Sequence, residues 1–346
     1  SIPIGIASVK LWDRAWDRKS KSERKYKSQH VTEKESYRWI ESALYTKELL
    51  SDTPTLTVIG DRESDIYEEF VLVPDNQTHL LVRSSVNRKL YNSDEKLFET
   101  LAASEEQGTY EIEIKGNKKR KTRVAKMSLR FKKVKIQKPN NISSKDYPDY
   151  VEMWAIETRE LPESVPEGEE PILWRLLTTH QIDNFKDAIQ CVGWYSQRWL
   201  IEELFRILKK KGLEIESTQL GTEHALKKLI TMSLQVALVT MTLKLSINNQ
   251  SKIKAALFFT EKQIQFIILL LGKLEGKTSI QKNPYQKETL AWAAWTIARL
   301  SGWSGYKSHG PPGYISIKSG LDIFYNKYEG YLLAIDLFTP KNVYKE

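Results

Sequence analysis

One stretch of the chain, from Tyr195 to Lys209, constrains the fold more than any other. Its residues are good helix formers and no Gly or Pro follows before Gly212, so it predicts a helix that ends near that glycine. At about 100° per residue, one carboxylate, three cations and a phenol fall within an arc of roughly 80°. These five residues are Tyr195, Arg198, Glu202, Arg206 and Lys209. The opposite side is largely apolar, which predicts that it is buried: Leu200, Ile201, Leu204, Ile207 and Leu208.

This polar stripe admits two interpretations. A carboxylate flanked by cations can hold a metal ion while the cations bind phosphate groups. Alternatively, the stretch is an amphipathic surface helix with ion pairs one turn apart, Arg198–Glu202 and Glu202–Arg206. Tyr195 and Trp199 are costly choices for a purely solvated face, which favours a site.

A second acidic position follows a predicted strand, residues 55–59, which is rich in β-branched side chains. Gly60 and Asp61 mark its carboxyl end, where ligands bind in α/β sheets. Asp61 there either coordinates a hard divalent cation or caps the element that follows. Asp65, four residues on, is better explained as a structural support or cap than as a metal ligand.

Between these acids the sequence predicts an antiparallel β-meander from about residue 86 to residue 170, with alternating apolar residues and a Gly116-Asn117 turn. Residues 115–138 contain twelve Lys or Arg and no acid, including Lys118, Lys119, Arg120 and Lys121. Such a basic ribbon can follow a DNA backbone, although lysines also protect strand edges from aggregation. The strand at residues 79–83 ends in Arg83, and another, residues 172–179, contains Trp174.

The ends of the chain differ in character. Residues 1–9 resemble a strand, residues 17–27 form a basic loop, and residues 33–50 are predicted to be helical. After Gly212 we predict helices at 223–245, 261–271, 288–300 and 321–333, whose broad apolar faces serve either a core or an interface.

Composition excludes several classes of protein. The chain has 346 residues, one cysteine and a net charge of +9, which is compatible with nucleic acid and excludes an internal disulfide framework. The five histidines are scattered, so spacing predicts no His/Cys metal cluster. The charge-free stretch 229–243 is too short and too polar for a membrane span, and a reducing cytosol is expected.

The spacing Tyr-x2-Arg-x3-Glu-x6-Lys is met by Tyr195, Arg198, Glu202 and Lys209. Together with the Asp61-Arg-Glu-x-Asp65-Ile block it resembles a branch of bacterial insertion-sequence transposases, the Asp-Asp-Glu enzymes with a ribonuclease H-like core. The resemblance spans nearly the whole chain, selects Glu202 over Glu203, and implies Asp61 and Glu202 as catalytic Mg²⁺ ligands, with Mn²⁺ plausible. It also implies DNA contacts for the signature cations, for Arg83, and for Trp174, which would stack on an extruded base.

The fold implied is α/β: a ribonuclease H-like core with an antiparallel β insertion between Asp61 and Glu202 and a C-terminal helical region. The expected divisions are 1–85 (partial core), 86–170 (basic β insertion), 171–250 (completion of the core with the Glu202 helix) and 251–346 (a helical region that pairs subunits). Expected partners are double-stranded transposon ends and a second copy of the chain, without a membrane, in the bacterial cytoplasm at the nucleoid.

The chain also departs from that family. The first catalytic aspartate of the family lies upstream of the segment that matches residues 2–9, and Asp13 and Asp17 are poor substitutes because they follow it in a loop. DNA transposition is therefore expected of an incomplete catalytic fragment that is inactive alone. Two alternatives remain: a non-catalytic DNA-binding or dimerising protein that inhibits a full-length transposase, and a ribonuclease H-like nuclease.

Overall fold

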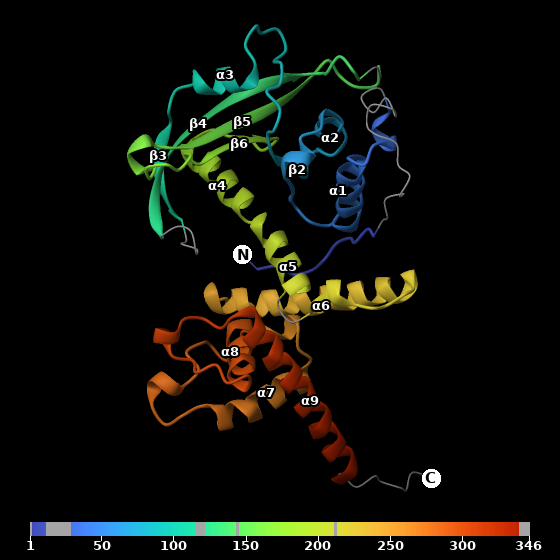
Figure 1. Cartoon of the computed structure of the whole chain (residues 1–346), viewed down its shortest axis with the longest axis vertical. Coiled ribbons are helices and arrows are strands. Elements are labelled where there is room, and N and C mark those ends of the chain that lie inside the picture. The colour runs from blue at the N-terminus through green and yellow to red at the C-terminus, as the bar shows by residue number, and fades with distance from the viewer. Residues whose placement is uncertain (1, 12–28, 115–121, 143–144, 211–212, 339–346) are drawn as a thin grey trace. The chain divides into compact units, whose positions relative to one another are not determined.

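The computed structural model describes residues 2–11, 29–114, 122–142, 145–210 and 213–338 (Figure 1). The chain forms two compact units. The first, here called the sheet unit, comprises Ala7–Arg198. The second, the helical unit, comprises Ser1–Ile6 and Trp199–Glu346. The chain therefore starts in the helical unit, passes through the sheet unit and returns.

The sheet unit is built on six strands in the order β1-β2-β6-β5-β4-β3. Only β1 and β2 are parallel, and every other neighbouring pair is antiparallel. The strands are β1 (Leu56–Gly60), β2 (Thr78–Arg83), β3 (Gly108–Ile114), β4 (Arg123–Gln137), β5 (Tyr150–Glu160) and β6 (Leu173–Thr178). The predicted α/β class is thus confirmed at the level of a mixed sheet with helices, and the meander strands extend that same sheet.

Helices cover both faces of this sheet. On one face the core contains side chains of α1 (Tyr37–Leu49), α2 (Tyr67–Leu72) and α3 (Leu97–Ala102), packed against Leu80 and Val82. On the other face α4 (Phe185–Ser196) packs against Leu81, Ile156 and Leu176. Leu80 and Val82 pack on one face and Leu81 on the other because successive side chains of a strand point to opposite faces of the sheet. The same rule places Arg83, two residues beyond Leu81, on the α4 face.

Strand β4 serves both faces. Leu129 and Phe131 contribute to the core on the α4 face, whereas Val134 and Ile136 contribute to the core under α1–α3. The odd-to-even change in the apolar positions encodes this switch, since each strand residue alternates its side.

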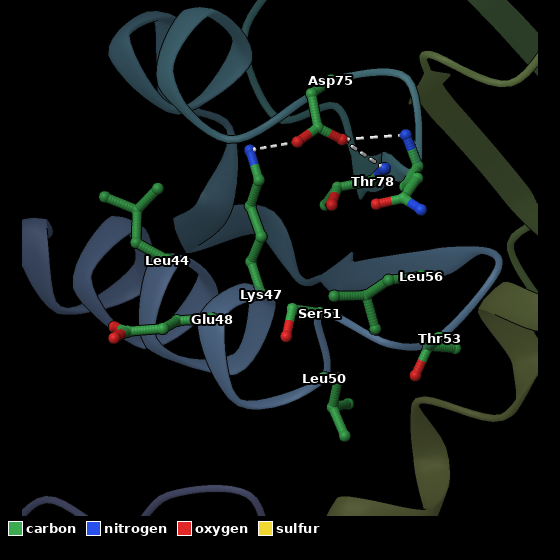
Figure 2. A pocket seen from close by; sticks show the side chains of 10 residues that line it. Leu44, Lys47, Glu48, Leu50, Ser51, Thr53, Leu56, Asp75 and Thr78 are labelled. Carbon is green, nitrogen blue, oxygen red and sulfur yellow. Dashed lines mark hydrogen bonds and ion pairs between the residues drawn. The ribbon is translucent and has the colours of Figure 1, made fainter.

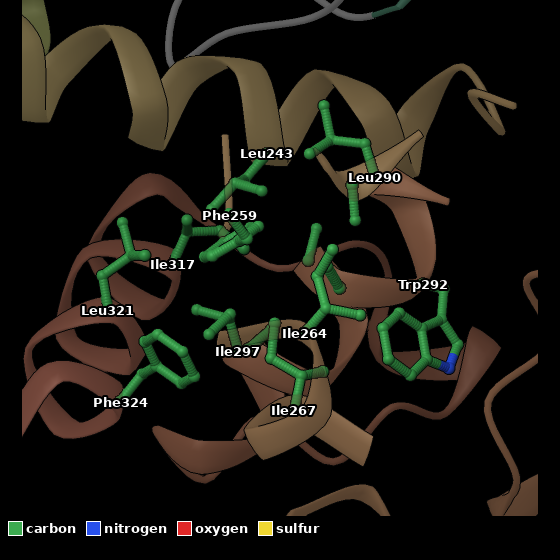
Figure 3. Close-up of a cluster of buried hydrophobic side chains, with 14 of the residues drawn as sticks. Leu243, Phe259, Ile264, Ile267, Leu290, Trp292, Ile297, Ile317, Leu321 and Phe324 are labelled. Atoms are coloured by element: carbon green, nitrogen blue, oxygen red, sulfur yellow. The ribbon is translucent and has the colours of Figure 1, made fainter. Parts of the chain in front are cut away.

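Two apolar clusters, the larger of them drawn in Figure 3, form the interior of the helical unit, whose described residues contain five α-helices. These helices are α5 (Trp199–Lys210), α6 (Glu223–Asn248), α7 (Glu261–Leu274), α8 (Leu290–Leu300) and α9 (Tyr314–Phe338). Helix α8 is central, because every residue from Leu290 to Ala298 is buried, Trp292 and Trp295 included. The predicted C-terminal helices are confirmed, and the predicted end of α8 at Ser301-Gly302 is present, with Gly302 at φ 88°.

Two predictions about elements are wrong. Residues 2–11 form no strand; Ile2 packs against the helical core, and the Pro3 carbonyl accepts a 2.8 Å hydrogen bond from the buried Thr242 hydroxyl. The helix expected to run through Tyr195 to Lys209 is interrupted at Gln197 and Arg198, between α4 and α5.

The interruption has a local cause. The amide of Gln197 bonds to Trp194 O and that of Arg198 to Tyr195 O, so the last turn of α4 tightens to i→i−3 bonding.

Helix α1 begins at Tyr37, four residues later than predicted, after a short 3₁₀ turn at Val31–Glu33.

Among the described residues, one helix is long and apolar enough to cross a membrane by length and composition alone, the 26-residue α6. Half of its most apolar part is buried inside the protein. It packs against α8 and α9, so its apolar character supplies the core of the helical unit.

Candidate functional site

Asp61 begins a tight turn at the carboxyl end of β1. Its Oδ1 accepts a 2.7 Å hydrogen bond from the Glu63 amide and so caps the 3₁₀ turn Arg62–Ser64. Gly60 makes this turn possible, because a Cβ at that position would lie 2.2 Å from Ser64 Oγ. The capping role considered for Asp61 is therefore present, and it uses one of the two carboxylate oxygens.

The neighbouring acids of the block are engaged in the fold. Asp65 is buried, and its Oδ2 accepts hydrogen bonds from the amides of Ser85 (2.7 Å) and Val86 (3.0 Å). Its Oδ1 receives Arg88 Nε at 2.7 Å. These contacts match the structural role expected for Asp65. Glu63 pairs with Arg38 of α1, so Asp61 is the acid of this block best placed to take a ligand.

Arg83 stands at the centre of a cationic cluster beside this turn. Its guanidinium donates to Leu173 O at 3.2 Å and interacts by hydrogen bond with the Tyr195 hydroxyl. Burial lowers the pKa of Arg83, and the nearby positive charges of Arg62 and Arg198 lower it further, while Tyr195 opposes them. A partly buried guanidinium that two neighbouring guanidiniums destabilise marks a place where an anion is favoured.

Trp174 and Tyr195 line the sheet beside Arg83. Their rings meet edge to face, with centroids 5.5 Å apart, and Tyr195 is buried in the core on the α4 face. Trp174 is partly buried against the same core. The core interpretation of Trp174 therefore applies to its packed side, and a half-buried indole still offers a surface for stacking.

The remaining residues of the predicted stripe belong to the helical unit. Arg206 pairs with Glu203, and Lys209 pairs with Glu216 at 2.8 Å. Burial would raise the pKa of Glu203, but hydrogen bonds from Arg206, Tyr314 and Trp199 outweigh it and lower that pKa. The surface-helix interpretation paired Arg206 with Glu202, whereas the structure pairs it with Glu203. Glu202 is half-buried.

The basic ribbon is partly neutralised. Lys118, Lys119, Arg120, Lys121 and the Gly116-Asn117 turn lie outside the described residues, as do Asp13 and Asp17. In the described part of the ribbon, the acids come from the neighbouring strand: Lys133 and Lys135 pair with Glu152, and Lys138 pairs with Asp149. An acid-free run along the sequence is thus not acid-free in space.

Two histidines that the sequence left scattered are in contact. The rings of His79 and His180 stack with centroids 4.0 Å apart, and His180 Nε2 lies 2.8 Å from the Thr57 hydroxyl. Burial lowers the pKa of His180 to about 4, with a smaller contribution from His79. Local sequence does not reveal this contact, because it depends on β2 lying between β1 and β6 in the sheet.

A cavity of about 340 Å³ opens at the opposite end of the same strands, where β1 begins at Leu56 and β2 at Thr78 (Figure 2). Lys47 and Asp75 face one another there at 2.7 Å, and Asp75 also accepts the Thr78 amide at 2.7 Å. The Lys47 hydrogen bond is the largest of the effects that lower the pKa of Asp75. Lys47 and Asp75 neutralise each other in this ion pair, which suits a structural role for both residues.

The donor type fits Mg²⁺, but the number of donors does not within either unit. Carboxylate oxygens are suitable ligands, and Asp61 in the sheet unit and Glu202 in the helical unit each supply one. Across the described ranges, no three His, Cys, Asp or Glu side chains gather as a metal site. No protein-family model matches the chain.

Proposed function

We propose that this chain is the DNA-handling part of a bacterial insertion-sequence transposase with a ribonuclease H-like core, and that it is incomplete as a catalyst. The observation that carries the proposal is the cluster of Arg62, Arg83 and Arg198 beside the Asp61 turn. It lies at the carboxyl end of the parallel pair β1–β2, which is where α/β sheets bind ligands.

A phosphodiester suits this cluster. Guanidinium groups bind phosphate oxygens through paired N–H donors, and Asp61 stands next to Arg62 in the chain. Arg206 and Lys209 would contact the DNA backbone only by exchanging their carboxylate partners for phosphate. Trp174 and Tyr195 would present aromatic surface to an unstacked base.

Asp61 in the sheet unit and Glu202 in the helical unit are each proposed as a carboxylate ligand for Mg²⁺, or for Mn²⁺ in its place. The ions would neutralise charge on the attacking and leaving oxygens of the phosphodiester. Two carboxylates are too few for such a pair, so a further acid is required. Strand β1 is at the edge of the described sheet, and a strand added parallel to it would bring its carboxyl end beside Asp61.

The remaining parts of the proposal concern the partners. A second copy of the chain would pair through the C-terminal helices, where α9 exposes Leu333, Leu337 and Phe338. The bacterial cytoplasm, at the nucleoid, is the compartment where such a protein would meet transposon ends.

A non-catalytic DNA-binding protein that inhibits a complete transposase is the second candidate. It is favoured because no three His, Cys, Asp or Glu side chains gather as a metal site among the described residues. Gel shift with and without Mg²⁺, followed by a strand-transfer assay, separates the candidates. Binding without nicking indicates the inhibitor, nicking without joining a nuclease, and joining a transposase; absence of binding contradicts all three.

The arginine cluster yields a first prediction. Replacing Arg62, Arg83 and Arg198 together with glutamine should weaken duplex binding and reduce the slope of log K against log salt by up to about 2.7, since each phosphate contact contributes about 0.9. The matched control replaces Lys133, Lys135 and Lys138 with glutamine. It removes the same charge from the basic ribbon instead of from the Asp61 turn, so a smaller change is expected if the cluster itself binds phosphate. Equal changes in the two variants would contradict a phosphate role for the cluster.

The basic residues of the ribbon that lie outside the described ranges yield a second prediction. Replacing Lys118, Lys119, Arg120 and Lys121 with alanine should also weaken duplex binding and flatten its salt dependence, by up to about 3.6 if all four contact phosphates. Titrations at several salt concentrations measure the slope. An unchanged slope would mean that these residues only keep a strand edge soluble.

A further inference from the structure

Glu69 is a buried acid behind the Asp61 turn. It lies in α2 with no exposed surface, and both of its carboxyl oxygens are 2.8 Å from Ser64 Oγ. A serine hydroxyl has a single proton to donate, so an ionised Glu69 would share one donor between two buried oxygens. A protonated Glu69 can donate to Ser64 while it accepts the Ser64 proton, and both groups are then satisfied. Burial of both carboxyl oxygens with one donor between them therefore favours the neutral acid, even though that donor by itself favours the ionised form.

Burial and the neighbouring charge of Asp65 both favour the protonated form of Glu69. Burial raises the pKa of Glu69 to about 7; the Ser64 hydrogen bond opposes this, and the negative charge of Asp65 adds to it. Arg88, which is also buried, is paired with Asp65. Tyr67 and Glu68 precede Glu69 in α2, and the Tyr67 hydroxyl is bonded to Pro148 O at 2.7 Å.

Ser64 also fixes the turn that presents Asp61. The Ser64 amide donates to Asp61 O at 3.1 Å and closes the 3₁₀ turn. The Ser64 side chain occupies the space that only a glycine at position 60 leaves open. A displacement of Ser64 would consequently loosen both the turn and the Asp61 cap.

We propose that Glu69 is a positioning residue: in its protonated form it holds Ser64, and through Ser64 it holds Asp61 in the orientation of the turn. Ionisation of Glu69 loosens the turn. The coupling between Glu69 and the turn stands by itself, whereas its consequence for metal binding by Asp61 rests on the proposed function.

Hydrogen exchange on the full chain tests the coupling. Protection of the amides of Glu63 and Ser64, corrected for intrinsic exchange, is compared at about pH 6 and about pH 8. Wild type should lose protection up to about tenfold, because the neutral fraction of Glu69 falls from about 90% to about 10% over that range. Glu69→Gln, a neutral isostere, should hold its protection within about twofold, and Ser64→Ala should be poorly protected at both values.

The control variant is Glu48→Gln, which changes an exposed glutamate of α1 in the same unit and should behave as wild type. If Glu69→Gln loses protection with pH as wild type does, or if wild type loses none, the proposal is overturned. A chain labelled with ¹³C-glutamate provides an independent measurement on wild type, where one carboxyl should titrate near 7. If every glutamate titrates below about 6, the proposal fails. None of these readouts depends on DNA cleavage, so failure of the proposed function leaves them unchanged.

Discussion

Replacing Gly320 with alanine is expected to lower the free energy of unfolding of the helical unit by about 2–3 kcal/mol. A Cβ at this position would lie 2.1 Å from the backbone oxygen of Ile297 and 2.8 Å from its carbonyl carbon. The obstruction is backbone on a helix whose residues are buried from Leu290 to Ala298, so α8 and α9 would have to separate. Helix propensity favours alanine by about 1 kcal/mol, which offsets only part of this cost.

Gly330 provides the matched control because it lies in the same helix with nothing within 4 Å of its virtual Cβ. Gly330→Ala should therefore stabilise the unit by about 0.5–1 kcal/mol. The free energy of unfolding of each variant is measured by urea denaturation, with amide hydrogen exchange in α8 as the probe of the helical unit. The two identical substitutions should have opposite signs, and a stabilised Gly320→Ala variant would contradict the close approach of α8 and α9.

This close approach also illustrates what the sequence could not reveal. Periodicity predicted both helices, since their apolar faces repeat with the helical period. Nothing in the local sequence distinguishes Gly320, which contacts another helix, from Gly330, which is exposed. The distinction depends on a contact between residues that are far apart in the chain.

The sheet was predictable for the same reason that the helices were. Alternating apolar residues predicted the β-meander. The apolar positions of β4 change from odd numbers up to Phe131 to even numbers from Val134, and the two halves of the strand accordingly pack on opposite faces of the sheet. The opening segment carries a similar apolar signal, yet residues 2–11 form no strand. Ile2 and Pro3 instead pack on the helical unit, so tertiary contacts decide the conformation of this segment.

The candidate site was predictable in its residue types but not in its partners. Strand position suggested Asp61, spacing suggested the signature stripe, and the resemblance added Arg83, whereas the pairing of Arg206 with Glu203 and the break at Gln197 depend on local geometry. Glu69 gave no signal, because a glutamate on a short helix is normally exposed. Its importance follows from its burial against Ser64.

The acids of the proposed site lead to the prediction with the largest effect. Residues 1–346 alone should bind DNA and nick or join transposon ends poorly, because a two-ion site needs more than the two proposed carboxylates and the described residues gather no group of three possible ligands. A complementing segment with an acidic strand that adds to the edge of β1 should restore Mg²⁺-dependent cleavage. Efficient strand transfer by residues 1–346 unaided would mean that another carboxylate, such as Asp65 or Asp13, completes the site.

In that complemented system, Glu202→Gln and Asp61→Asn should each reduce cleavage by about 10³-fold and leave DNA affinity within about twofold, because each removes charge from the metal ligands without removing a phosphate contact. Glu203→Gln is the sharpest control. It alters the adjacent residue, whose carboxylate is already committed to Arg206, and it should retain most of the cleavage. Cleavage rates measured under single-turnover conditions distinguish the two glutamates. If Glu203→Gln were as damaging as Glu202→Gln, the signature spacing would have selected the wrong glutamate, and the metal ligand would lie one residue further along α5.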